Sequence, residues 1–313
     1  MRILVQGDSH GNLRDIIPKI YKAGEYKINH VVVVGDFGLW THKADGQLFL
    51  DEVNEAARIN NLSVFAIGGN HENWDHWNWM CDNLPTHKGF AMARRRVLLA
   101  PKVHEWTWAG KKFAGAGGAV SVDREYRIMS ENNDPELYHM YGEKPRGGGP
   151  RSEYWPNEQF TDAHVAEFKQ RIGEGSVDYL FTHDCSNHTP WQTRLKNDID
   201  SEIHRRRIDE VIAHATPRFH FHGHMHEKYD WYNVQPLGYY DLREAKRAGA
   251  VPVHTIGLEA FRDFNSWGVL DTEADRWYWP SQFYVAQDER AQRKAQHDAD
   301  RGAGEFVITK SAV

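Results

Sequence analysis

The first part of the chain alternates short apolar runs with stretches of helical periodicity. Residues 2–6, 31–34 and 63–67 are apolar runs of strand length, and the second of them consists of consecutive valines. Residues 12–23 and 47–60, which lie between these runs, show helical patterns. Strands that alternate with helices in this way predict a parallel sheet with crossover helices.

The pattern changes after about residue 103. Residues 105–108 and 112–116 flank Ala109-Gly110-Lys111, which predicts a hairpin. Residues 121–157 form a long irregular stretch rich in glycine, proline and charge, which predicts an insertion over the functional site. The other predicted elements are helices at 162–172 and 201–214, strands at 179–181 and 218–221, and antiparallel strands at 229–234, 251–256 and 267–270. We expect one domain over residues 1–285 and a polar tail, helical or disordered, at 286–313.

The composition indicates a soluble globular protein of 313 residues with a net charge of −6. The sequence contains no run of about 18 apolar residues, so no membrane span is predicted. The first apolar run is too short for a signal peptide. The two cysteines, Cys81 and Cys185, fit a reduced cytoplasm and argue against a cysteine-based zinc site. The acidic charge gives no basic field for nucleic acid, and the local run Arg94-Arg95-Arg96 is interpreted as a solvated face.

Five of the predicted strands are each followed immediately by side chains that can bind a metal ion. They are Asp8 and His10, Asp36, Asn70 and His71, His183, and His224 and His226. Because ligands of α/β sheets bind at the carboxyl ends of strands, we expect these side chains to share one sheet edge. Taken singly, each has a structural explanation as a turn, a buried histidine or, for Asn70, a helix N-cap. Their common placement favours a metal site.

The ligand types narrow the choice of metal. Carboxylate, amide and imidazole groups without thiolate suit manganese, iron, zinc or nickel, and the set is too rich in imidazole for a magnesium or calcium site. The number of groups exceeds what one ion needs. Two ions roughly 3.5–4 Å apart that share a bridging carboxylate would use them. We therefore expect two divalent metal ions.

The motifs resemble the sequence pattern of the calcineurin-like metallophosphoesterase superfamily. That pattern consists of five blocks, which occur here in the same order: D-x-H, G-D, G-N-H-[D/E], H and G-H-x-H. The five blocks span Asp8 to His226. The resemblance implies an α/β fold, a four-layer αββα sandwich of two mixed β-sheets flanked by helices. More weakly, residues 117–124, Trp155-Pro156 and Ser186 resemble small bacterial and bacteriophage members of the superfamily.

The resemblance also implies a role for each residue. One metal ion would be held by Asp8, His10, Asp36 and His226, and the other by Asp36, Asn70, His183 and His224. Manganese is the leading candidate, with iron, zinc or nickel as alternatives. A hydroxide between the ions would attack phosphorus, and His71 would donate a proton to the leaving oxygen as general acid.

Two blocks depart from the pattern of the superfamily's protein serine/threonine phosphatases. Those enzymes read G-D-x-x-D-R-G and R-G-N-H-E, whereas here Asp36 is followed by Phe37-Gly38-Leu39-Trp40 and Gly68 stands in place of the second arginine. Both phosphate-binding arginines are missing, and so is the carboxylate that would orient His71. The sequence therefore does not favour a protein phosphatase.

Arg124 is our candidate to replace the missing phosphate-binding arginines, because a planar guanidinium suits phosphoryl oxygens. The structural alternative is a surface ion pair with Asp123 or Glu125. Aromatic residues also lie near the motifs. Trp40 and the cluster Trp74, Trp77 and Trp79 would either stack a nucleobase beside the metals or pack against the sheet.

We therefore expect a metal-dependent phosphoric ester hydrolase, foremost a phosphodiesterase that acts on nucleotide-like or other small phosphate esters. A nuclease on DNA or RNA is the second hypothesis, disfavoured because binding of a phosphodiester backbone draws on several lysine or arginine contacts. A protein phosphatase and a catalytically silent scaffold come next, and the scaffold is disfavoured because all eight motif positions are present. The sequence gives no oligomeric state.

Overall fold

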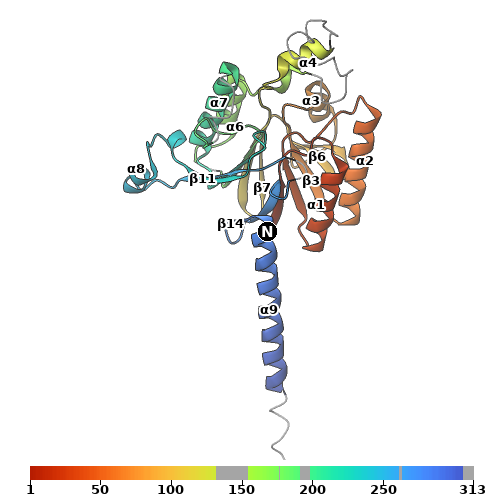
Figure 1. The fold of residues 1–313 in the computed structure, drawn as a ribbon, viewed down its shortest axis with the longest axis vertical. Helices are drawn as coiled ribbons and strands as arrows, with labels where there is room; N and C mark the ends of the chain where they lie inside the picture. The colour runs from red at the N-terminus through yellow and green to blue at the C-terminus, as the bar shows by residue number, and fades with distance from the viewer. Residues whose placement is uncertain (132–153, 176, 191–197, 261–262, 306–313) are drawn as a thin grey trace, which may run out of the picture.

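Two β-sheets face each other in the computed structural model, which describes residues 1–131, 154–175, 177–190, 198–260 and 263–305 (Figure 1). The larger sheet has the strand order β14-β13-β1-β2-β3-β6-β5-β4 and the smaller one β11-β12-β10-β9-β8-β7. The strands of the larger sheet are β1 (Arg2–Gln6), β2 (His30–Val34), β3 (Ser63–Ile67), β4 (Thr86–His87), β5 (Phe90–Arg94), β6 (Val97–Leu99), β13 (Trp267–Asp271) and β14 (Arg276–Tyr278). Those of the smaller sheet are β7 (Val103–Trp108), β8 (Lys111–Ala116), β9 (Tyr179–Thr182), β10 (Phe219–His222), β11 (Tyr229–Asn233) and β12 (Val253–Gly257).

Helices cover the outer faces of both sheets (Figure 1). On the larger sheet these are α1 (Leu13–Glu25), α2 (Ala44–Ile59) and α3 (Trp74–Asn83), and on the smaller sheet α6 (Asp162–Arg171) and α7 (Ile199–Ala215). The remaining described helices are α4 (Arg124–Glu131), α8 (Leu242–Arg247), α9 (Pro280–Glu305) and the short 3-10 turns η1 (Pro156–Glu158) and η3 (Gln235–Leu237). The order of layers is the predicted αββα sandwich, which is confirmed.

Three apolar clusters hold these four layers together. One lies between the larger sheet and its helices, one between the two sheets, and one between the smaller sheet and its helices. The cluster between the sheets is rich in aromatic rings, among them Trp106, Phe113 and Phe181, which stack on one another. Stacked rings bury large apolar areas in fixed geometry, so they set the position of one sheet relative to the other.

Most strands and helices predicted from periodicity are present, and the differences are instructive. The segment expected at 251–256 is β12, which is antiparallel to β11 but parallel to β10. The insertion expected at 121–157 is not irregular at its ends, which form α4 and η1, while residues 132–153 lie outside the described residues. Local periodicity misses α4 because its helical stretch is only 8 residues long.

The C-terminal helix α9 projects away from the sandwich (Figure 1). It begins at Pro280, and the buried Phe283 anchors it in the core. Residues 286–305 of the predicted tail are thus the continuation of a helix that begins at Pro280, while residues 306–313 lie outside the described residues. Among the described helices, none combines the length and the apolar character that a membrane crossing requires.

Candidate metal centre

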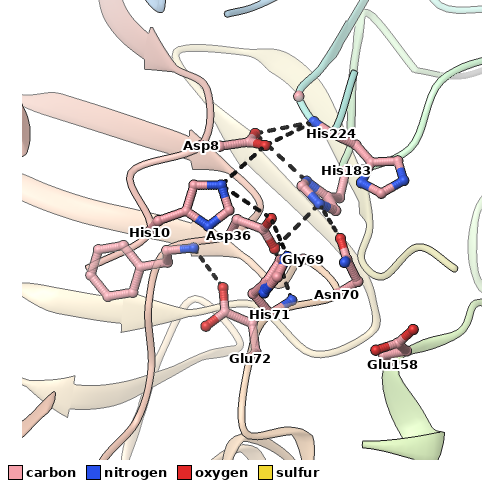
Figure 2. Close-up of polar contacts among 12 residues, drawn as sticks. Asp8, His10, Asp36, Gly69, Asn70, His71, Glu72, Glu158, His183 and His224 are labelled. Carbon is pink, nitrogen blue, oxygen red and sulfur yellow. Dashed lines mark hydrogen bonds and ion pairs between the residues drawn. The ribbon is translucent and has the colours of Figure 1, made fainter. Parts of the chain in front are cut away.

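Each of the eight motif residues lies just past the carboxyl end of a strand. Asp8 and His10 follow β1, Asp36 follows β2, and Asn70 and His71 follow β3, whereas His183 follows β9 and His224 and His226 follow β10. The first three strands belong to the larger sheet and the other two to the smaller one. The two sheets therefore contribute jointly to one site (Figure 2).

One group of side chains gathers around Asp8. The Nε2 atom of His226 lies 2.9 Å from Asp8 Oδ2. The Nε2 atom of His10 lies 3.9 Å from the same oxygen and 3.4 Å from His226 Nε2. Asp8, His10 and His226 each offer one ligand atom, and these atoms all lie within 4.8 Å of one another, which is compatible with a shared metal ion.

A second group gathers around His183. Its Nε2 atom lies 3.3 Å from Asp36 Oδ1 and 2.9 Å from Asn70 Oδ1. The ring of His224 packs with its centroid 4.9 Å from that of His183. The backbone N–H of His224 donates to Asp8 Oδ1 at 3.1 Å, which ties the two groups together.

Asp36 belongs to both groups, and its two oxygens face different histidines (Figure 2). Oδ2 lies 3.7 Å from His10 Nε2, whereas Oδ1 lies 3.3 Å from His183 Nε2. The backbone N–H of His71 donates to Oδ1 at 2.9 Å and fixes the orientation of the carboxylate. This arrangement would suit a carboxylate that bridges two cations.

The protonation states suit cation binding. Burial opposes ionisation of Asp36, but the neighbouring His183, His71 and His10 outweigh it and lower the pKa of Asp36 well below its usual range. Burial also opposes a charge on His183, yet Asp36 and Asp8 raise its pKa to about 10. Two buried carboxylates therefore stay anionic and attract positive charge, which metal ions supply when bound.

The tautomer of His183 also suits a ligand. Its Nδ1 atom lies 3.0 Å from the carbonyl oxygen of Val34, which can only accept a hydrogen bond. The proton that a neutral His183 ring keeps is therefore on Nδ1, which leaves Nε2 available to a metal ion; in the protonated ring Nε2 donates to Asn70 and Asp36 instead. Histidines that bind metals are commonly held in this way.

The backbone of the site is locally strained. His10, Asp36, His224 and His226 have φ values of 47°, 42°, 63° and 52°, in the left-handed region that side chains other than glycine rarely adopt. Such conformations cluster at functional sites. Space is equally restricted, because a methyl group in place of the Gly69 hydrogen would overlap the Asp36 carboxylate.

Glu72 holds the loop that follows Asp36. Its buried carboxylate accepts hydrogen bonds from the backbone N–H groups of Phe37 at 2.6 Å, Gly38 at 3.1 Å and Leu39 at 2.7 Å. Burial and the charge of Asp36 raise the pKa of Glu72 to about 7, while the three donors oppose this shift. The last residue of the G-N-H-E block therefore supports the loop of the G-D block.

His71 lies beside both groups, with its Nε2 atom 4.0 Å from Asp36 Oδ2. Arg127 of α4 is buried and donates from Nη2 to His71 Nε2 at 2.7 Å. Because a guanidinium can only donate, Nε2 must accept this hydrogen bond. Burial and the charge of Arg127 lower the pKa of His71 to about 4, against the opposing effect of Asp36.

Arg124 lies one helical turn before Arg127 and has other partners. Its guanidinium forms ion pairs with Asp198 at 2.9 Å and Asp200 at 2.8 Å, both at the start of α7. It does not form the pairs with Asp123 or Glu125 that the sequence suggested as an alternative; Asp123 lies 3.0 Å from Arg127 Nε instead. Of the two arginines, Arg127 is therefore the one in contact with the site.

The tryptophans near the motifs pack into the protein. Trp74 and Trp77 are fully buried, and their indole N–H groups donate to the carbonyl oxygens of Gly69 and Ala100. Trp40 is also buried and donates to the carbonyl oxygen of His71. These rings are not free to stack a base, which favours the packing interpretation for these three residues.

Sequence reasoning missed Arg127 and Glu158. Glu158 belongs to η1 and is fully buried, with Oε2 4.0 Å from Arg127 Nη1. Arg127 lies near the start of the insertion predicted at 121–157 and Glu158 directly follows its end, where no periodicity marked them. A helix prediction over residues 124–131 would have placed Arg124 and Arg127 on one helix face, since residues three apart are neighbours there.

The sequence profile of the family described as calcineurin-like phosphoesterase matches residues 1–228, a span that contains all eight motif residues. The chain belongs to this family. It is accordingly a metal-dependent phosphoric ester hydrolase. No curated protein sequence matches the chain.

The solved structures that match the chain share little sequence with it. The protein TT1561 of Thermus thermophilus matches with a TM-score of 0.50 and 12% identity over 88% of this chain and 96% of that one, which supports the fold. A dimetal phosphatase from Danio rerio matches with a TM-score of 0.44 and 12% identity over 86% and 91%. An archaeal phosphodiesterase matches with a TM-score of 0.38 and 13% identity over 89% and 98%.

Replacement of Glu72 by alanine is expected to destabilise the fold, because it leaves three buried backbone donors without an acceptor. We expect a loss of about 3 kcal/mol in the free energy of unfolding, measured by denaturant titration. Glu55→Ala is the matched control, since Glu55 forms only an exposed ion pair with Arg58 and should change stability little. Equal effects of the two substitutions would contradict the assigned role of Glu72.

Proposed function

We propose that the protein hydrolyses a small phosphodiester with a water molecule activated by two divalent metal ions. The observation that carries this proposal is the position of Asp36, whose two oxygens face His10 on one side and His183 on the other. A carboxylate shared in this way suits a pair of ions better than a single one.

The proposed ligands fall into two sets that share Asp36. Asp8, His10, Asp36 and His226 would hold one ion, and Asp36, Asn70, His183 and His224 the other. When bound, the ions lower the pKa of a water molecule between them and neutralise charge on phosphoryl oxygens. The mixed oxygen and nitrogen set favours manganese, with iron, zinc or nickel as alternatives.

The protein's own groups would act on the leaving side of the phosphate. His71 would donate a proton to the leaving oxygen. Arg127 is placed to bind the phosphoryl oxygens, because its guanidinium lies against His71 Nε2. If Arg127 paired with the phosphate instead, His71 Nε2 would be free to carry a proton. The positive charge of Arg127 would also be neutralised, which would raise the pKa of His71.

A small, nucleotide-like ester is the proposed substrate class. Support comes from the net charge of −6, which gives the chain no overall positive field to attract a nucleic acid backbone. A nuclease remains the second candidate. The scarcity of cysteine supports a reduced compartment such as the cytoplasm.

The proposal is tested by hydrolysis of bis-p-nitrophenyl phosphate and p-nitrophenyl phosphate, with manganese, nickel, zinc or magnesium added to metal-stripped protein. We expect manganese-dependent cleavage of the diester with little cleavage of the monoester. Preference for the monoester would point to a phosphatase, and cleavage of single-stranded DNA at a comparable rate would favour the nuclease. Lack of cleavage with every metal would contradict the proposal.

His71→Ala is expected to retain both metal ions, because the proposed ligand sets do not include His71, but to lose turnover. The loss should be about 100-fold to 10,000-fold on an alkyl ester, whose leaving oxygen needs a proton. With p-nitrophenolate, a good leaving group, the loss should be much smaller. Rates and metal content of the variant measured side by side would show this; equal losses on both esters would argue against a general acid.

Arg127→Ala is expected to reduce kcat/KM by roughly tenfold to a hundredfold, the effect of one charged hydrogen-bonded contact. Inhibition by inorganic phosphate should weaken in parallel. Arg124→Ala is the matched control, since the Arg124 guanidinium is already paired with Asp198 and Asp200. If Arg124→Ala reduced kcat/KM more than Arg127→Ala does, the phosphate-binding residue would be Arg124, as the sequence suggested.

A further inference from the structure

A hydrogen-bond relay lies behind the proposed metal ligand Asn70. The Nδ2 atom of Asn70 donates to Ser121 Oγ at 3.0 Å. Its Oδ1 atom lies 2.9 Å from His183 Nε2 (Figure 2). Only the oxygen end of an amide can bind a metal ion. The contact with Ser121 therefore selects which end of Asn70 faces the metal centre.

Ser121 is itself held by Glu158. Its backbone N–H donates to Glu158 Oε1 at 2.7 Å, and the neighbouring Ser121 hydroxyl acts as a donor that lowers the pKa of Glu158. An ionised carboxylate only accepts, so above the pKa of Glu158 the hydroxyl proton of Ser121 is directed at this carboxylate. The free lone pair of Ser121 Oγ must then accept from the amide N–H of Asn70, which gives the relay a fixed polarity.

The position of Glu158 is fixed by a buried lysine. Lys102 Nζ donates to the carbonyl oxygens of Asn157 at 2.8 Å and Glu158 at 3.0 Å, and it lies over the ring of Trp74. Burial raises the pKa of Glu158 to about 7, against the hydrogen bonds from Ser121 and the charge of Arg127. Burial of a carboxylate is energetically costly, so its contact with a single serine indicates a specific structural role for Glu158.

The second oxygen of Glu158 has a different neighbour. Oε2 accepts no hydrogen bond from the described residues and faces Arg127 Nη1 at 4.0 Å. One carboxylate thus connects Asn70, through Ser121, with the arginine that contacts His71. These two connections use different oxygens, so they can be separated by substitution.

We propose that Ser121 and Glu158 are positioning residues that hold Asn70 with Oδ1 toward the metal ion shared by Asp36, Asn70, His183 and His224. This proposal rests on the ligand sets proposed above. It assigns a role to residues outside the five motif blocks, and it predicts that one of the two metal sites depends on them while the other does not.

The test is a manganese titration of metal-stripped wild-type and variant proteins at a pH above the pKa of Glu158. Metal content after equilibrium dialysis gives the two affinities, and electron paramagnetic resonance distinguishes a coupled ion pair from a single ion. Ser121→Ala and Glu158→Ala should weaken one site by about 10-fold to 100-fold and leave the other unchanged, as for other groups that orient ligands. The coupled signal should give way to that of a single ion.

Glu158→Gln provides the conservative rescue. Glutamine keeps an oxygen for Ser121 and places its amide nitrogen toward Arg127, so metal affinity should stay near that of wild type. Its KM for the diester should rise, because the carboxylate that faces Arg127 is lost. Loss of metal affinity in Glu158→Gln equal to that in Glu158→Ala would contradict the relay.

Ser201→Ala is the matched control for loss of a buried serine hydroxyl, since Ser201 Oγ donates to Asp198 at 2.8 Å, outside the relay. It should bind both ions as wild type does. Wild-type affinity at both sites in Ser121→Ala would overturn the relay alone, as would an equal loss in Ser201→Ala. Failure of the wild-type protein to bind a manganese pair would overturn the proposed ligand sets and the relay with them.

Discussion

The site depends on one buried carboxylate, Asp36, which faces His10 with one oxygen and His183 with the other. Its orientation is imposed by the backbone N–H of His71, and its space is limited by the close approach of Gly69. Burial of a second carboxylate, Asp8, in the same site is unfavourable unless positive charge compensates both. The local fold is therefore arranged for cations, which agrees with the chemistry of the family to which the chain belongs.

Asp36 lies where the two sheets meet, so the packing of the sheets controls the relative positions of the proposed metal ligands. Asp8 and Asp36 follow strands of the larger sheet, whereas His183 and His226 follow strands of the smaller one. The aromatic cluster between the sheets fixes their relative position. Ligands carried by rigid elements hold their separations more closely than ligands on long loops. The site residues with positive φ keep this unfavourable conformation because the surrounding structure holds the backbone in place.

Sequence reasoning predicted the sandwich and most of its strands because their signals are local: apolar runs of strand length, each followed by a polar motif. Those motifs also predicted that the eight side chains would meet, and the structure brings them together. The roles of Arg127 and Glu158 could not be predicted from the sequence, because they depend on contacts with His71 and Ser121, which are distant in sequence. No local pattern encodes such a contact, and the short helix α4 gave too few residues for a periodicity.

The metal side and the substrate side of the site have different origins in the chain. The motif blocks supply the proposed metal ligands, whereas Arg127 lies near the start of the insertion predicted at 121–157 and Glu158 directly follows its end. This explains why the motifs identify the reaction but not the ester. The two sides are nevertheless connected, because Glu158 contacts Ser121 with one oxygen and faces Arg127 with the other. A change in the insertion that moves Glu158 should therefore alter phosphate binding and the affinity of one metal ion together.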